Sequence, residues 1–163
     1  MKKIDNYRDS IWKLFLDENS RTPLWVLDDF IINYKDLKIE WFIIKNSFFT
    51  DSKVLKSISR WWENLFVSEK SIKDLWFYEK VKKLLIEWNS IIWKKVVSET
   101  WENLWNVYNF IFSTSSFVWI SIVIKKSFFW LFFYWKERII PKNEILEIKK
   151  NEIIINNKEL VKA

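Results

Sequence analysis

Two adjacent carboxylates, Asp28 and Asp29, are of the residue type that serves as paired general acid and base. Both lie in an apolar run, and neighbouring residues of a β-strand point to opposite faces of the sheet. Glu99 and Glu102 form a second acidic pair, but they flank an expected turn, where solvated carboxylates are common. We therefore expect neither pair to be catalytic. A metal-dependent hydrolase activity at Asp28 or Asp29 is the one enzymatic alternative.

The chain contains no histidine and no cysteine. The usual zinc ligands, the usual proton shuttle near neutral pH, thiolate nucleophiles and disulfides are thus all absent. No serine has a histidine to activate it, and there is no glycine-rich phosphate loop. We expect a protein that is not an enzyme and that uses no metal and no cofactor.

A mixture of cations and aromatic rings in the second half of the chain is the candidate partner surface. Aromatic side chains beside lysines suit base stacking with single-stranded RNA. Packing in a core is the favoured alternative, because Ser47-Phe48-Phe49 recurs as Ser127-Phe128-Phe129. The loop is longer than its counterpart in the first half, and the extra residues are the expected contact with a partner or a second copy. The candidate residues are Lys125, Lys126, Trp130, Phe132 and Tyr134.

The net charge of +6, from 27 Lys and Arg against 21 Asp and Glu, allows an acidic partner such as RNA or a membrane surface. Ordinary solubility charge is the favoured explanation. The N-terminal residues lack the apolar stretch of a signal peptide, and Lys125 and Lys126 interrupt the most apolar region. We expect a cytoplasmic protein without a transmembrane segment.

Short apolar runs rich in Ile, Val and Phe predict the strands that hold these residues. The runs are residues 11–16, 24–32 and 39–44 in the first half, and 92–97, 104–112, 118–124, 138–141, 145–148 and 152–155 in the second. The halves are related, because nine of the 26 positions from 24 to 49 are identical to those 80 residues later. Between them, Ser71 to Asp74 resembles a helix-starting box, which predicts a linker with a short amphipathic helix over residues 71–87.

Thirteen tryptophans and no glycine make the composition unusual. A chain with several tight turns normally uses glycine for positive φ, because other residues are strained there. The tryptophans occupy expected turns and strand entries, such as those at Trp61, Trp62, Trp93 and Trp101. Some bacterial lineages read UGA as glycine, whereas a common translation table reads it as tryptophan. Our hypothesis is that most or all of the tryptophans replace glycine, the alternative being a natural tryptophan-rich protein. If glycine belongs there, several of Trp61, Trp62, Trp101 and Trp105 should be exposed in loops or at strand starts.

With glycine at the tryptophan positions, the second half resembles the PRC-barrel domain. The resemblance is carried by Ile92 to Val97, by Leu104 to Phe110, by a third strand near Val118, and by a strand ending in a proline-led turn. The first half resembles a divergent copy, with Ile11-Trp12-Lys13 and Leu24 to Phe30. The family-motif positions are Trp12, Trp25, Trp93, Trp101, Trp105 and Pro141.

This resemblance implies an all-β protein of two small PRC-like β-barrels in tandem, joined by the linker with its short helix. The expected domains are residues 6–70 and 88–160, with the linker at 71–87. The family's barrels serve as assembly or adaptor modules, including one in a ribosome maturation factor. We therefore expect a protein partner, with RNA or the ribosome as a further candidate, and a monomer or homodimer. The alternative function is an aromatic, basic protein associated with a membrane surface.

Overall fold

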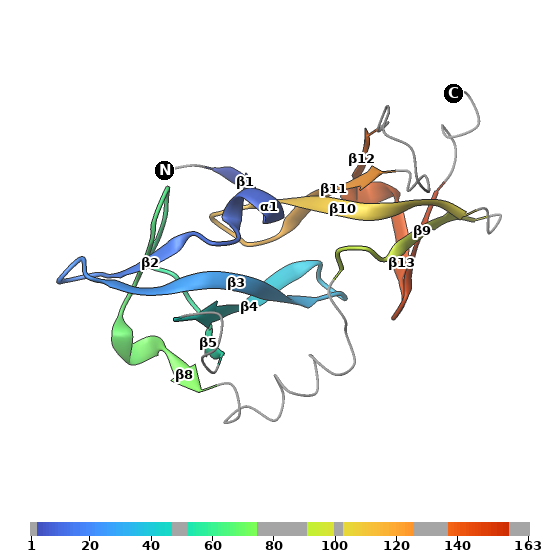
Figure 1. The fold of residues 1–163 in the computed structure, drawn as a ribbon. Coiled ribbons are helices and arrows are strands. Elements are labelled where there is room, and N and C mark those ends of the chain that lie inside the picture. The colour runs from blue at the N-terminus through green and yellow to red at the C-terminus, as the bar shows by residue number, and fades with distance from the viewer. Residues whose placement is uncertain (1–2, 47–51, 75–90, 100–102, 126–136, 157–163) are drawn as a thin grey trace, which may run out of the picture. The chain divides into compact units, whose positions relative to one another are not determined.

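A computed structural model describes residues 3–46, 52–74, 91–99, 103–125 and 137–156 of the chain (Figure 1). Most of the described residues lie in β-strands, which confirms the all-β fold class. The chain forms two compact units, one of residues 1–86 with 112–118 and one of residues 87–111 with 119–163. Each unit contains a mixed sheet with both parallel and antiparallel strand pairs.

The first unit begins with a short strand and a single helical turn. Its elements are β1 (Ile4–Asn6), α1 (Tyr7–Ser10), β2 (Leu14–Asp17), β3 (Pro23–Asn33), β4 (Lys38–Lys45), β5 (Lys53–Leu55), β6 (Arg60–Trp61), β7 (Leu65–Val67), the 3-10 turn η1 (Glu69–Ser71) and β8 (Lys73–Asp74). The sheet has the order β6-β7-β2-β3-β4-β5-β8, and β2 and β7 are its parallel pair. Figure 1 shows the long β3 beside β2 and β4.

The second unit repeats this order with its own strands. They are β9 (Lys95–Ser98), β10 (Asn103–Ser113), β11 (Trp119–Lys125), β12 (Glu137–Pro141), the 3-10 turn η3 (Lys142–Glu144), β13 (Ile145–Ile148) and β14 (Glu152–Ile155). The path β13-β14-β9-β10-β11-β12 matches β6-β7-β2-β3-β4-β5 strand for strand. The parallel pair β14 and β9 corresponds to β7 and β2. Each of the apolar runs that predicted a strand overlaps a strand of the structure.

The backbone of the turn that precedes β2 is repeated before β9. The amide of Trp12 donates to the carbonyl of Leu27, and the amide of Trp93 donates to that of Val107, each at 2.8 Å. Both tryptophans have positive φ, at 73° and 74°. Because of this turn, β2 and β9 each begin three residues later than the apolar runs at Ile11 and Ile92 predicted.

The expected helix does not begin at Ser71. Both the amide and the hydroxyl of Ser71 donate to the carbonyl of Ser68, which closes the 3-10 turn. Lys73 and Asp74 then pair with β5 as the edge strand β8. A strand partner therefore replaces the helical hydrogen bonds that the capping pattern predicted, and residues 75–87 lie outside the described part of the chain.

The core of the first unit is aromatic. Phe30 and Phe42 from the sheet pack around Trp61, which is 2% exposed, with ring centroids about 6 Å apart. Phe112 and Phe117 belong to the same unit and complete the cluster, at 5.3 and 5.6 Å from Trp61. Such contacts stabilise a core beyond the buried area alone.

The described core of the second unit contains an aromatic stack and buried aliphatic side chains. Phe110 stacks on Trp119 with a centroid distance of 4.9 Å. Val96, Val107 and Ile153 are among the fully buried residues of this unit. In a regular strand every second residue faces the core. In β10 the buried residues Val107 and Phe110 are three residues apart, so the alternation shifts by one residue here.

Candidate functional site

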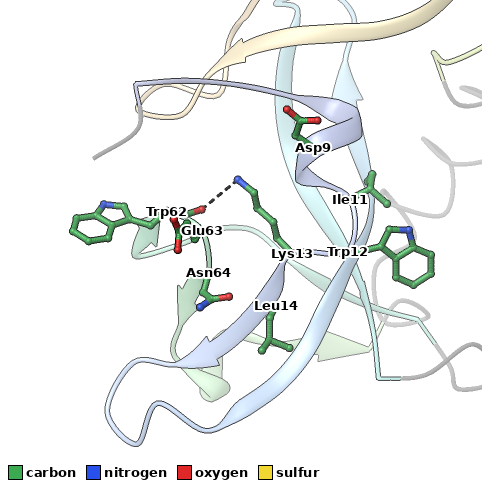
Figure 2. Close-up of a pocket in the computed structure, with 8 residues that line it drawn as sticks. All are labelled: Asp9, Ile11, Trp12, Lys13, Leu14, Trp62, Glu63 and Asn64. Atoms are coloured by element: carbon green, nitrogen blue, oxygen red, sulfur yellow. Dashed lines mark hydrogen bonds between the residues drawn. The ribbon is translucent and has the colours of Figure 1, made fainter.

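An open groove of about 880 Å³ lies in the first unit, between the turn that precedes β2 and the turn that joins β6 to β7 (Figure 2). The end of α1 contributes to one wall. The lining residues are Asp9, Ile11, Trp12, Lys13, Leu14, Trp62, Glu63 and Asn64. A groove of this size with a mixture of apolar and polar side chains is typical of a ligand or peptide site.

Lys13 ties the two sides of the groove together. Its ammonium forms an ion pair with the carboxylate of Asp5 and donates to the carbonyl of Trp62 at 3.2 Å. The side chain of Asp5 is fully buried and also accepts a hydrogen bond of 2.9 Å from the Trp61 indole. The ammonium lies 5.4 Å from the centroid of the same ring. Lys13 is therefore committed to structural contacts within the unit.

The second unit uses its equivalent lysine in the same way. Lys94 follows Trp93 as Lys13 follows Trp12, and its ammonium donates to the carbonyl of Lys150 in the turn between β13 and β14. Burial lowers the pKa of Lys94. In both units, a lysine next to the positive-φ residue thus binds the turn of a hairpin, β6–β7 in the first unit and β13–β14 in the second.

The tryptophan side chains are exposed at some of the predicted turn positions and buried at others. Trp12, Trp62 and Trp93 are 53%, 56% and 66% exposed. Figure 2 shows the rings of Trp12 and Trp62 pointing outward on opposite sides of the groove. Trp62 lies in the turn after β6, as predicted. The prediction is wrong for Trp61, because its ring fills the aromatic core and its indole binds Asp5.

The remaining family-motif positions lie in or near strands. Trp25 is half-buried in β3, with the Lys53 ammonium 5.0 Å from its ring centroid. Trp105 is half-buried in β10 beside an irregularity in its pairing with β9. Pro141 ends β12 and precedes η3, which agrees with a proline-led turn. Trp101 lies outside the described residues.

Asp28 and Asp29 lie at a β-bulge, which strict strand alternation did not predict. Leu27 pairs with Ile44 and Asp29 with Ile43, so Asp28 is the additional residue. Asp28 forms an ion pair of 2.8 Å with Lys45.

Burial raises the pKa of the Asp29 carboxyl, and the charge of Asp28 raises it further. Hydrogen bonds from the Phe30 amide, at 2.8 Å, and from the Tyr7 hydroxyl act in the opposite direction. Burial and the charge of Asp29 also raise the pKa of Tyr7 and that of Tyr34. The charge of Asp28 thus adds to the raised pKa of Asp29, and the contacts of both carboxylates are those of a structural cluster.

Of the predicted partner surface, only Lys125 is among the described residues. Its ammonium forms an ion pair of 2.6 Å with Glu137 and lies 3.5 Å from the centroid of the Tyr108 ring. The hydrogen bond from Lys125 to Glu137 raises the pKa of the lysine. Lys126, Trp130, Phe132 and Tyr134 lie outside the described part of the chain.

Sequence reasoning missed the roles of Lys13 and Asp5. The lysine was visible as the third residue of the repeated Ile-Trp-Lys motif, but a motif does not say what its ammonium binds. The pattern around α1 could have been found, because Asn6 caps the helix by accepting from the Asp9 amide at 3.0 Å. That cap places Asp9 at the groove.

Among the described residues, no helix is both long and apolar enough to cross a membrane. In the same part of the chain, no group of three or more acidic side chains is arranged to hold a metal ion. No protein-family model matches the chain, and no curated protein matches it significantly.

Proposed function

We propose that the chain is a non-enzymatic adaptor or assembly protein, made of two small PRC-like barrels in tandem, that binds a protein partner in the cytoplasm. The observation that carries this proposal is the repeat of one sheet order in both units, together with the same lysine-tied turn. In these turns Lys13 and Lys94 make contacts that stabilise the fold. The open groove of the first unit is left as the candidate contact surface.

The resemblance to PRC-barrel domains directs the choice of partner toward ribosome maturation or RNA metabolism. The net charge of +6 supports work near RNA. Within such an assembly the protein acts through a protein contact, as a monomer or a homodimer. Function on a small barrel belongs to its surface sites rather than to the fold.

The experiment is a pull-down from the native host with the tagged chain, before and after nuclease treatment. We expect a protein partner that is retained after the nucleic acid has been digested. Loss of every captured protein on digestion would replace the adaptor proposal with direct RNA binding.

A second candidate is association with a membrane surface, which the exposed rings of Trp12, Trp62 and Trp93 favour. Co-sedimentation of the host-made protein with neutral phosphatidylcholine vesicles separates the two functions. Binding that persists at high salt would support the membrane function and contradict the adaptor proposal. Recovery of the protein in the supernatant is the result that we expect.

We also propose that most of the thirteen tryptophan positions carry glycine in the protein made by its own host. The support comes from Trp12 and Trp93, which occupy left-handed backbone positions with exposed rings. An intact mass of the host-made protein, or the codons of its gene, tests the proposal. Thirteen UGG codons would rule it out.

A further inference from the structure

We infer that the groove of the first unit receives an extended, basic segment of the partner, in which lysine or arginine side chains alternate with aliphatic ones. This inference rests on the proposed protein partner. It specifies a basic peptide segment as the ligand of the groove, whereas the proposed function does not specify which kind of segment the partner contributes.

The charges that line the groove favour a cationic ligand. Asp9 and Glu63 are exposed carboxylates on opposite walls, one at the end of α1 and one in the turn after β6 (Figure 2). Lys13 is the one basic residue among the lining residues, and its ammonium is paired with the buried Asp5. The groove is therefore acidic in a chain whose net charge is +6.

The carboxylate of Asp9 keeps its charge available to a ligand. One of its oxygens accepts a hydrogen bond of 2.7 Å from the side-chain amide of Asn6, which is a neutral group. This bond fixes the carboxylate in place without neutralising it. A cation that reaches the groove thus meets a positioned partner.

The apolar part of the groove fits the rest of a basic segment. Ile11 and Leu14 are the aliphatic residues of its lining. Lysine and arginine bury their aliphatic stems on such surface while their charged ends remain at polar groups. Trp12 and Trp62 also line the groove, but its charged and aliphatic residues are the same whether position 12 or 62 carries tryptophan or glycine.

The same charges disfavour nucleic acid at this groove. Phosphate groups need cations that are not already neutralised, and the lining offers only Lys13. RNA bound by this protein would therefore contact another surface.

The test is a titration of the full chain with a short labelled peptide of alternating leucine and arginine. The counterpart peptide carries glutamate in place of arginine, and polyuridine is the nucleic-acid probe. We expect the basic peptide to bind, with an affinity that falls as salt rises. The double variant Asp9→Asn with Glu63→Gln should weaken this binding by about fivefold, since each exposed charge pair contributes modestly.

A matched control carries the same change of charge away from the groove. Asp36→Asn with Glu147→Gln alters two exposed carboxylates, and Asp36 accepts from Asn33 as Asp9 accepts from Asn6. The control should bind the basic peptide like the unaltered chain, and thermal unfolding should be similar for all three proteins.

Equal binding of the acidic and basic peptides would overturn the inference. It would also be overturned if the two double variants bound the basic peptide with equal affinity, or if Asp9→Asn with Glu63→Gln changed the binding of polyuridine. If the pull-down retains its protein partner equally on both double variants, the groove inference fails while the adaptor proposal stands. Groove-dependent peptide binding with no captured protein would support the groove chemistry and contradict the adaptor proposal.

Discussion

Trp12 and Trp93 occupy the same backbone position in the two units. Their φ angles are 73° and 74°, and each amide donates to the carbonyl of the opposite strand at 2.8 Å. Left-handed φ brings the Cβ of an L-residue too close to the backbone, at a cost of roughly 1 kcal/mol or more. Because both rings are largely exposed, little packing offsets this strain.

Substituting glycine at these positions should therefore stabilise the protein. We expect Trp12→Gly and Trp93→Gly each to raise the free energy of unfolding by about 1 kcal/mol, less the added freedom of glycine in the unfolded chain. The alanine variants retain Cβ and should gain nothing. Urea denaturation of the four variants measures the difference, and glycine variants less stable than the alanine ones would contradict the strain argument.

Trp61 should respond in the opposite direction. Its ring is 2% exposed and contacts Phe30, Phe42 and Phe112. Trp61→Ala should cost about 3 to 5 kcal/mol, the usual range for emptying a large aromatic site. Chemical denaturation checks this value. A gain in stability would mean that the core packs better without the ring, as expected if glycine is the natural residue there.

The ion pair of Lys13 and Asp5 should be essential for the first unit. Lys13→Met leaves the buried carboxylate without its cation, which costs about 3 to 5 kcal/mol when the charge is inaccessible to water. The double variant Lys13→Met with Asp5→Leu should lose less than the two single variants together. Urea denaturation of the cycle measures the coupling, and a single-variant loss below about 1 kcal/mol would indicate effective solvent screening.

Phe112 lies in β10 but belongs to the first unit. It is fully buried, and its ring centroid lies 5.5 Å from that of Phe30. Phe112→Ala should destabilise that unit by about 3 to 5 kcal/mol, whereas Phe112→Leu should cost much less. Hydrogen exchange locates the effect. Loss of protection in β3 and β4 is expected, and a loss confined to β10 and β11 would contradict the assignment of this segment.

The strands were predictable because their apolar runs carry a local signal. Residues 145–148 and 152–155, for example, were predicted with the bounds that β13 and β14 have. Asp28 was placed by strict alternation, and the bulge at this position depends on pairing with β4 rather than on local sequence. The same limit explains β8, where an edge partner decided between strand and helix.

The groove could not be predicted, because its walls are distant in the sequence. Asp9 and Glu63 meet at one surface only through the return of β7 beside β2. Lys13 likewise finds Trp62 across that arrangement. Non-local pairing of this kind leaves no local signal in the sequence, whereas the helix cap at Asn6 does.

Asp29 should make the stability of the first unit depend on pH. In the second unit Asn109 takes its place, 80 residues later, and its side-chain oxygen accepts from the Phe110 amide at 2.9 Å. Asp29 does the same for the Phe30 amide at 2.8 Å. The hydrogen bond therefore does not require a charge, and Asp29→Asn should preserve it.

Burial, followed by the charge of Asp28, raises the folded-state pKa of Asp29 above its unfolded value. Folding thus favours the protonated form, and the stability that Asp29 contributes is complete below the unfolded pKa. That contribution is lost as the pH rises through the folded pKa. Asp29→Asn should consequently be more stable than the unaltered chain at neutral pH, and the gap should close as the pH falls. Urea denaturation across the acidic range measures both proteins. A variant that is less stable at neutral pH would show that the hydrogen bond from Tyr7 to the carboxylate outweighs burial.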